Sequence, residues 1–428
     1  MRSILKVSAA LSATLVLVAG CGGAAEPGAD HKPKASKSKK PAASAPPRKS
    51  YDPPQRFAAK GVPLPEAAGR GSITRDGTVP RPLPLALHGT NAYVAAADSL
   101  QVIDTGTGTG TGKTTATVRP RHKPVAESDA ETDAPVLTHD GQLILVPFLV
   151  EFPGKGTTPS QVGIELDAVD TKTNKTAWTV DLDDLPSWGS EHDSRVRVVA
   201  ATKSTAVVSA YGGDAVTYAV DLGTHKASWH KEHVGTATVI GNTAVSVTSK
   251  DSVRQQVIGL DINHDGKQIW KKLDGYELTA HPAGPDLIAI TGNDYNSGDA
   301  MGVVLAADGS QAAELSGDLS GLACHYDDAS VTICQTEEPR TIALNATTGK
   351  QLWSLPDKGA NRVAPTVTAA WHGVVYGTTS NGPVALDAKT GADRSTSPGA
   401  SPNAVNEYTG VALNETDHRT LIAHPATG

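Results

Sequence analysis

The chain has 428 residues and a formal net charge of −7, with 39% apolar and 19% charged residues. This composition is typical of a globular body with a large core, and length alone allows roughly two or three domains. The 42 Gly and 28 Pro beside only two Met and three Phe argue against long helices and favour many strands joined by tight turns.

The first 21 residues have the features of an export signal. Arg2 and Lys6 precede an apolar run at residues 7–19, which is too short to span a membrane as a helix. The run ends at "LVAGC", residues 17–21, which resembles a bacterial lipoprotein signal, although Val18 stands where Leu is more usual. The resemblance implies a signal peptide at residues 1–20 and an acylated Cys21. The alternative is ordinary secretory cleavage beside an incidental Cys.

Residues 21–62 are predicted to be the lipidated Cys followed by a disordered Lys/Pro/Ala/Ser linker. The stretch "KPKASKSKKPAASAPPRK" has almost no apolar content and cannot form a core. Residues 22–60 carry a net charge of +6 and the signal carries +2. Because the whole chain has a net charge of −7, residues 61–428 must carry −15. The basic linker is expected to act as a spacer, which its prolines favour. The alternative is that its lysines bind the anionic headgroups of membrane lipids. The acidic body argues against a nucleic-acid partner.

The sequence "TGTGTGTGKTT" at residues 105–115 looks like a phosphate-binding loop. That motif needs Gly, four residues and then Gly-Lys-Ser/Thr, but Thr107 stands at the first Gly position before Gly112 and Lys113. The β-branched stretch that follows does not favour the helix that the motif requires. We therefore interpret the run as a long turn between strands.

An internal repeat organises the rest of the chain. Copies such as "IALNATTGKQLW" (342–353), "IGLDINHDGKQIW" (258–270), "YAVDLGTHKASW" (218–229) and "DAVDTKTNKTAW" (167–178) share an apolar strand, a turn beginning at Asp or Asn, and a Trp eight or nine residues later. A further copy at residues 383–394 lacks the Trp, and degenerate copies complete the series. The turn anchors are Asp104, Asp170, Asp221, Asp261, Ala306, Asn345, Asp387 and His424.

Each copy is predicted to be a hairpin with a structural role for its marked residues. The Asp or Asn side chain can accept hydrogen bonds from backbone amides two residues on, and Gly or Asn supplies a positive φ. The recurring Trp178, Trp229, Trp270 and Trp353 are expected to pack as the same wedge between neighbouring units.

The spacing of the anchors predicts an all-β fold, a β-propeller of four-stranded blades over residues 63–428. Most gaps lie near the roughly 40–45 residues of one blade, which favours eight blades, with seven as the alternative. Because the last copy ends at its turn, we expect an N-terminal strand, in or near residues 71–80, to close the final blade.

Cys324 and Cys334 bracket a second predicted hairpin. If residues 328–330 form its turn, the two Cys face each other across the strands, and a disulfide follows in an exported protein. The neighbouring "HYDD" at residues 325–328 is predicted to be a solvated loop.

The repeat resembles that of pyrroloquinoline-quinone-dependent dehydrogenases and their non-enzymatic relatives, including propeller lipoproteins of outer-membrane assembly. Family members that bind the quinone carry an adjacent-Cys disulfide and a calcium site, neither of which is matched here, so no cofactor is expected. "DINHDGK" (261–267) matches half of a calcium loop, but Lys272 stands where the closing Glu is needed, so no metal is predicted.

We therefore expect a monomeric, lipid-anchored propeller on the extracytoplasmic face of the membrane, with no catalytic residues. It would act as a binding or scaffold module for a protein or cell-wall partner. The alternatives are a quinoprotein-type oxidoreductase and a sensor for a small ligand in the central channel.

Overall fold

The computed structural model describes residues 48–428 except 76–77, 107–111, 126–131, 183–194, 213, 250 and 252. The chain divides into two units, residues 1–47 and 48–428, and the description below concerns the second. Its described residues form antiparallel sheets and one short 3-10 helix, η1 (Glu66–Gly69). No helix in this described part is long and apolar enough to cross a membrane.

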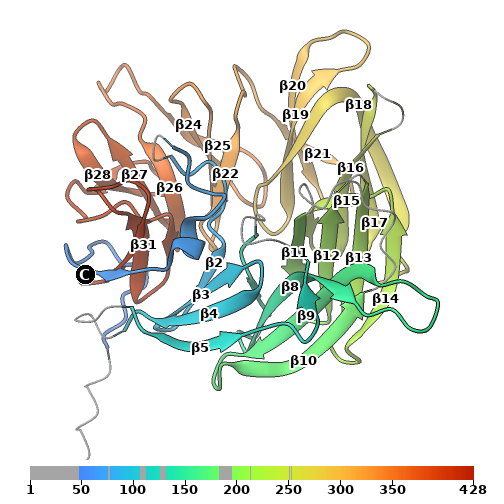
Figure 1. Cartoon of the computed structure of the whole chain (residues 1–428). Helices are drawn as coiled ribbons and strands as arrows, with labels where there is room; N and C mark the ends of the chain where they lie inside the picture. The colour runs from blue at the N-terminus through green and yellow to red at the C-terminus, as the bar shows by residue number, and fades with distance from the viewer. Residues whose placement is uncertain are drawn as a thin grey trace, which may run out of the picture. The chain divides into compact units, whose positions relative to one another are not determined.

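The N-terminal half of the second unit contains three sheets (Figure 1). The first has the order β2-β3-β4-β5: β2 (Leu85–His88), β3 (Asn91–Ala96), β4 (Ser99–Asp104) and β5 (Thr114–Val118). The second has the order β10-β9-β8-β6 with β7 also on β8: β6 (Lys123–Pro124), β7 (Val136–Leu137), β8 (Leu143–Phe152), β9 (Gln161–Asp170) and β10 (Lys175–Leu182). The third is β11 (Arg195–Ala201), β12 (Thr205–Tyr211), β13 (Ala215–Asp221) and β14 (Lys226–Glu232).

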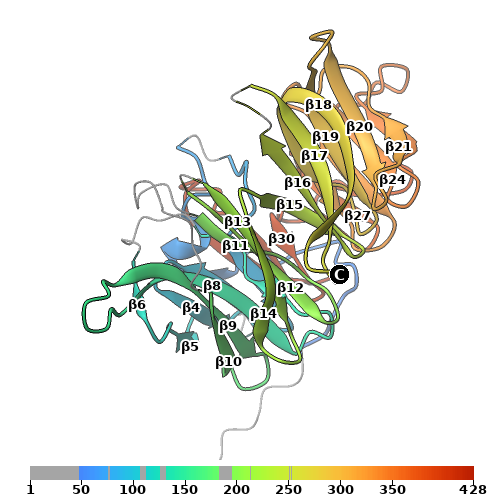
Figure 2. The same ribbon diagram turned by 90° about the vertical axis from the view of Figure 1, so that its right-hand side faces the viewer.

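A seven-stranded sheet follows, in which one long strand joins two sets of strands (Figure 2). It comprises β15 (Gly235–Ile240), β16 (Thr243–Ser249), β17 (Gln255–Asp261), β18 (Lys267–Pro282), β19 (Leu287–Asp294), β20 (Ala300–Ala306) and β21 (Gln311–Glu314). The first part of β18 pairs with β17 and the second part with β19, and Gly275 pairs with both. β18 is thus the last strand of one set and the first of the next.

Three further sheets complete the chain. Two are regular: β22 (Ala323–Tyr326), β23 (Val331–Gln335), β24 (Thr341–Asn345) and β25 (Gln351–Leu355), then β26 (Thr366–Trp371), β27 (Val374–Thr379), β28 (Gly382–Asp387) and β29 (Asp393–Ser395). The last has the order β1-β32-β31-β30: β30 (Ala404–Val405), β31 (Thr409–Leu413), β32 (Leu421–Pro425) and β1 (Val62–Pro63).

An N-terminal strand pairs with the C-terminal sheet, but it is not the segment that the sequence favoured. Val62 pairs with Ala423 and Pro63 with Ile422, whereas the described part of residues 71–80 forms no strand. Ile73 packs instead into the apolar cluster of Val62, Leu64 and Leu421. The β-branched residues that suggested a strand are used for this packing. The chain packs on the sheets even before β1, since Phe57 is only 5% exposed, within the range assigned to the linker.

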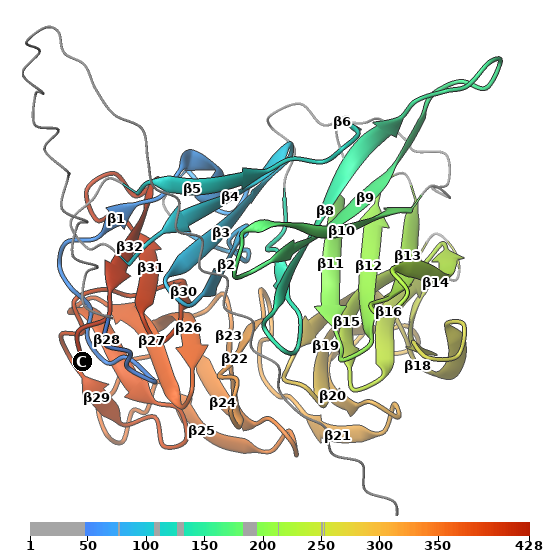
Figure 3. The same ribbon diagram turned by 90° about the horizontal axis from the view of Figure 1, so that it is seen from below.

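The described residues form eight buried apolar clusters, each spanning two neighbouring sets of strands. The cluster around Tyr93 and Phe148 joins the first two sheets, and the cluster around Val62, Leu85 and Val411 joins the last sheet to the first. Figure 3 shows β2–β5 lying between β30–β32 and β8–β10, as these contacts require. The third strand of a set is buried on both faces, as the five consecutive buried residues of β13 show, because sheets pack on either side of it. These four-stranded sheets are consistent with β-propeller blades.

Candidate functional site

The repeated turns lie where the third strand of each set ends. Seven anchors are each the last residue of a strand. In chain order these strands are β4, β9, β13, β17, β20, β24 and β28, and the anchors are Asp104, Asp170, Asp221, Asp261, Ala306, Asn345 and Asp387. His424 lies within β32, and its Nδ1 is 2.9 Å from the carbonyl oxygen of Ala58. The seven turns lie at the same ends of the sheets, and we call this side the anchor face.

The anchor side chains are occupied by their own turns. Oδ1 of Asp221 accepts the amides of Gly223 and Thr224 at 3.0 and 2.6 Å, and Asp170, Asn345 and Asp387 accept equivalent pairs. At Asp261, Oδ1 accepts the backbone amide of Asn263, and the other carboxylate oxygen is hydrogen-bonded to the imidazole of His264. Hydrogen bonds from Thr224 hold the pKa of Asp221 below its usual value. The anchors therefore organise turns and offer little to a ligand.

The four blade Trp side chains each contact the turn of the following unit. Three indole N–H groups donate to the carbonyl of the residue just after the next anchor: Trp229 to Ile262 (3.0 Å), Trp270 to Ala307 (2.8 Å) and Trp353 to Ala388 (2.8 Å). The Trp178 ring stacks on His225, in the turn that follows Asp221, with 4.6 Å between ring centroids. Each Trp thus links one set of strands to the next.

The receiving turn must leave room for this ring. Gly309 has a φ of 76°, and a Cβ there would lie 2.7 Å from the Trp270 ring. Glycine therefore suits this position for two reasons: it adopts a positive φ without strain, and it has no Cβ to collide with the Trp270 ring.

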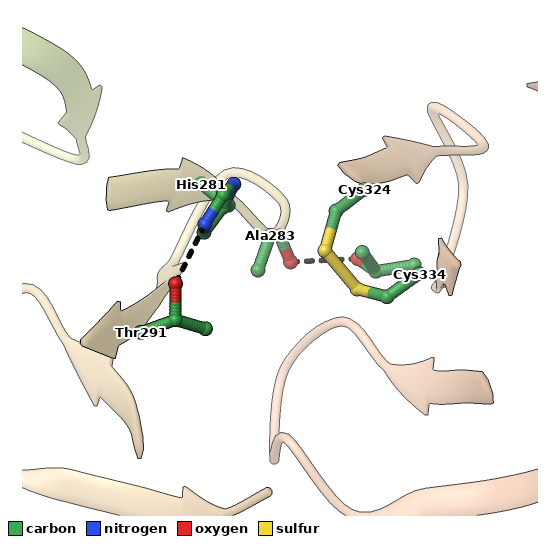
Figure 4. The surroundings of a disulfide bond; sticks show 6 residues. His281, Ala283, Thr291, Cys324 and Cys334 are labelled. Carbon is green, nitrogen blue, oxygen red and sulfur yellow. Dashed lines mark hydrogen bonds between the residues drawn. A yellow bond between two sulfur atoms is a disulfide. The ribbon is translucent and has the colours of Figure 1, made fainter. Parts of the chain in front are cut away.

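Cys324 and Cys334 form a disulfide across β22 and β23 (Figure 4). The two residues are direct partners in the strand register, with Cα atoms 4.0 Å apart. From the same strand β23, the hydroxyl of Thr332 donates to the carbonyl of Ala283 at 2.6 Å. The disulfide therefore holds a hairpin that is bonded to the preceding set of strands.

We expect the double variant Cys324→Ala/Cys334→Ala to lose about 2 kcal/mol of unfolding free energy. This value is at the low end for a disulfide because the bridged loop is short. Urea denaturation of the oxidised and reduced wild type and of the variant measures the loss. An unchanged midpoint in both the variant and the reduced wild type would contradict a stabilising role.

A cavity of about 1310 Å³ opens at the ends of the sheets that lie opposite the anchor face. We call this opposite side of the molecule the recognition face. It is lined by the turns between second and third strands in the last three sheets and by the first residues of β26. Residues 59–61 and 78–80 complete its wall. Gln335 bridges two sheets there, since its amide donates to the carbonyl and accepts from the N–H of Val367, both at 2.9 Å.

The cavity lining combines apolar and polar side chains and carries charges of both signs. It presents hydroxyl, amide and proline side chains together with Lys60, Glu337, Arg340 and Glu415, and its described lining contains no Phe, Tyr or Trp. The hydroxyl of Thr368, in a bulge of β26, is buried without a hydrogen-bond partner in the described residues. The hydroxyl and amide groups of this lining suit a ligand that is rich in such groups, while a planar cofactor would find no Phe, Tyr or Trp ring among the described lining residues.

A second polar group lies where β9 and β10 meet the chain between β5 and β6. Glu165 is fully buried and accepts the amides of Arg121 and His122 at 2.6 and 3.0 Å. Asp167, also buried, accepts the Thr179 hydroxyl at 2.7 Å. Burial raises the pKa of Asp167 to about 6, with a further contribution from the nearby charge of Glu165.

The same place contains the one group of three potential metal ligands among the described residues. Ligand atoms of His122, Glu165 and Asp181 lie within 4.8 Å of one another. Arg121 lies among them, with its guanidinium 2.7 Å from Asp181, so a positive side chain already balances these carboxylates. The sequence analysis missed this group. The alternation of Glu165 and Asp167 in an otherwise apolar strand was the signal that could have found it. The half calcium loop at residues 261–267 assembles no such group.

The prediction of a solvated loop at residues 325–328 is wrong. His325 and Tyr326 belong to β22, and Asp327 is fully buried. Oδ1 of Asp327 accepts the amides of residues 329, 330 and 331, so this carboxylate shapes the turn of the disulfide hairpin. A buried carboxylate that accepts several amides organises backbone, as in the anchor turns.

Cys21 and the centre of the Thr-Gly run lie outside the described residues. At the edges of the run, Asp104 ends β4, its Oδ1 accepts the amide of Gly106 at 2.7 Å, and β5 begins at Thr114. A strand, not a helix, follows Gly112 and Lys113.

The repeated hairpins and the four-stranded antiparallel sheets are consistent with the blades of a β-propeller. A family model described as "Outer membrane protein assembly factor BamB" matches residues 325–424, which include Asn345, Trp353 and Asp387. No curated protein matches the chain.

Three solved structures show a distant likeness. The computationally designed Ika8 protein is 16% identical, covering 80% of this chain and 95% of its own, with a TM-score of 0.47. Hydrazine synthase of Kuenenia stuttgartiensis is 14% identical (74% and 98% covered, TM-score 0.43). BamB from Moraxella catarrhalis is also 14% identical (80% and 95% covered, TM-score 0.38). With TM-scores below 0.5, none of the three supports a conclusion about this chain.

Proposed function

We propose that the protein is an extracytoplasmic, lipid-anchored β-propeller that binds a protein or cell-envelope partner through its recognition face. The cavity of about 1310 Å³ on that face carries the proposal. Its lining, which combines apolar side chains with hydroxyl and amide groups, fits a polypeptide, whose backbone amides can pair with those hydroxyl and amide side chains. The partial match to a family named for outer-membrane assembly agrees with a scaffold role.

The architecture that we propose has eight blades closed by β1. The long β18 counts as two blade strands, and the eight apolar clusters join each set to the next, including the last to the first. The anchor at Cys21 and the monomeric state belong to the same proposal and rest on the sequence. In a propeller of this kind, the variable turns of one face are free to recognise a partner, while the repeated anchor turns of the other face stabilise the fold.

The quinoprotein alternative does not fit these residues. Cys324 pairs with Cys334 across two strands, so the chain has no adjacent-Cys disulfide to lie against a quinone. The cavity lining described above has no Phe, Tyr or Trp for the planar ring.

Blocking the cavity should abolish partner binding. Thr366 is exposed at the start of β26 and lines the cavity, so Thr366→Trp should place a large ring in it and obstruct binding without disturbing the core. We expect at least a tenfold loss of the proteins that cross-link to the full chain on intact membranes, measured by quantitative mass spectrometry. Thr176→Trp, on the exposed outer strand β10, is the matched control. Equal recovery with both variants would contradict binding at the cavity.

A further inference from the structure

The seven-stranded sheet presents a second surface on the recognition face, distinct from the cavity. It consists of the turns before β17 and β20 with the middle of β18, described residues 251, 253–256, 274–278 and 293–299, which we call the crest. Figure 2 shows β17, β18 and β19 side by side where these residues lie. Val253 and Tyr295 are 59% and 42% exposed there, among the few large apolar side chains that are exposed in the described chain.

The exposed Tyr295 is held in place by its neighbours. The Arg254 guanidinium lies 4.7 Å from the centre of the Tyr295 ring and donates to Asp274 at 2.5 Å. Gln256 donates to the other oxygen of Asp274, also at 2.5 Å. The amide of Tyr295 donates to the carbonyl of Asp274 at 3.1 Å. An aromatic side chain fixed before a partner arrives loses little entropy on binding.

The crest is acidic. It contains five carboxylates, Asp251, Asp274, Glu277, Asp294 and Asp299, against Arg254 and, in the sequence, Lys250. Hydrogen bonds from the amides of Ser297 and Asn296 hold the pKa of Asp294 below its usual value, so it stays ionised at neutral pH. Lys267, Lys271 and Lys272 lie in the part of β18 that precedes Asp274, outside the crest.

We infer that the crest docks a basic segment of a partner protein, with an apolar or cationic side chain of that segment packed against Tyr295. Charge complementarity selects a Lys/Arg-bearing segment, and the fixed ring supplies an anchor of the kind that dominates protein interfaces. This inference deepens the proposed function, because it names the chemistry of the partner and a second place where it binds.

The test places a photo-reactive benzoylphenylalanine at position 295 of the full chain and cross-links intact membranes. The cross-linked segment is then identified by mass spectrometry. We expect a peptide with net positive charge, and a yield at least tenfold above that of the same probe at Leu352, which is 43% exposed on the outer strand β25.

Charge is tested separately with Asp251→Asn/Asp294→Asn. An Asn side chain can still accept the turn amides that Oδ1 of each Asp accepts, so these turn hydrogen bonds can remain while the charge is lost. We expect the cross-link to fall about tenfold in this variant and in 0.5 M salt. A neutral or acidic cross-linked segment, a yield equal to that at Leu352, or no effect of the charge variant would each overturn the inference. Because Thr366→Trp leaves the crest intact, failure here and failure of the cavity proposal are distinguishable.

Discussion

Replacing Trp270 with Ala should destabilise the protein by about 3–5 kcal/mol, the range for truncating a large buried aromatic side chain. The ring is 9% exposed and packs with Ile240, Val257 and Leu305 between neighbouring strand sets. Its removal leaves a cavity and an unpaired carbonyl at Ala307. Thermal and urea denaturation of the purified second unit or the full chain measures the loss.

Two neighbouring variants separate the contributions to this loss. Trp270→Phe keeps a ring but removes the N–H, so we expect a smaller cost of about 1–3 kcal/mol from the unsatisfied carbonyl. Ile269→Ala changes the adjacent residue of β18, which is 49% exposed, and should cost less than about 0.5 kcal/mol. Equal effects of the Trp270 and Ile269 substitutions would refute the role of the Trp as an inter-sheet link.

The repeat could be read from the sequence because each anchor turn is local. Asp221 bonds to amides two and three residues on, so spacing alone exposes the pattern. The disulfide was predictable for the same reason, since Cys324 and Cys334 flank one hairpin. The carbonyl that receives each indole N–H lies 33 to 37 residues away, and it became predictable only once the repeats were seen to stack.

The cavity and the buried carboxylates of β9 could not be predicted in this way, because they do not arise from a local repeat. The cavity wall combines residues 59–61 with turns near residues 336 and 415, and no periodicity connects segments so far apart. The N-terminal strand was misplaced because β1 spans only two residues, too few for a sequence pattern. Residues 71–80 were the more β-branched choice, but packing of Ile73 against the last sheet accounts for that composition.

Asp167→Asn should stabilise the protein above pH 7 and have little effect near pH 4. The folded-state pKa of Asp167 is raised to about 6 from an ordinary value near 3.8, so the folded state favours the protonated side chain. The wild type therefore loses stability as pH rises between about 4 and 6, and the full penalty remains above that window. A shift of about two pKa units corresponds to about 3 kcal/mol, an upper figure for this variant.

The Asn substitution preserves the local geometry, because its carbonyl oxygen can still accept the Thr179 hydroxyl that now donates to Asp167. Arg121, His122, Glu165 and Asp181 face the same group, so the pH profile of the variant also reports on their remaining charges. Midpoints of thermal unfolding from pH 4 to pH 8 should diverge between wild type and variant as pH rises. Asp286→Asn, on an exposed turn, should give no such divergence. If Asp167→Asn instead lowered the midpoint equally at pH 4 and pH 8, the carboxylate would be stabilising the fold in its ionised form through its hydrogen bond, and burial would not be its dominant cost.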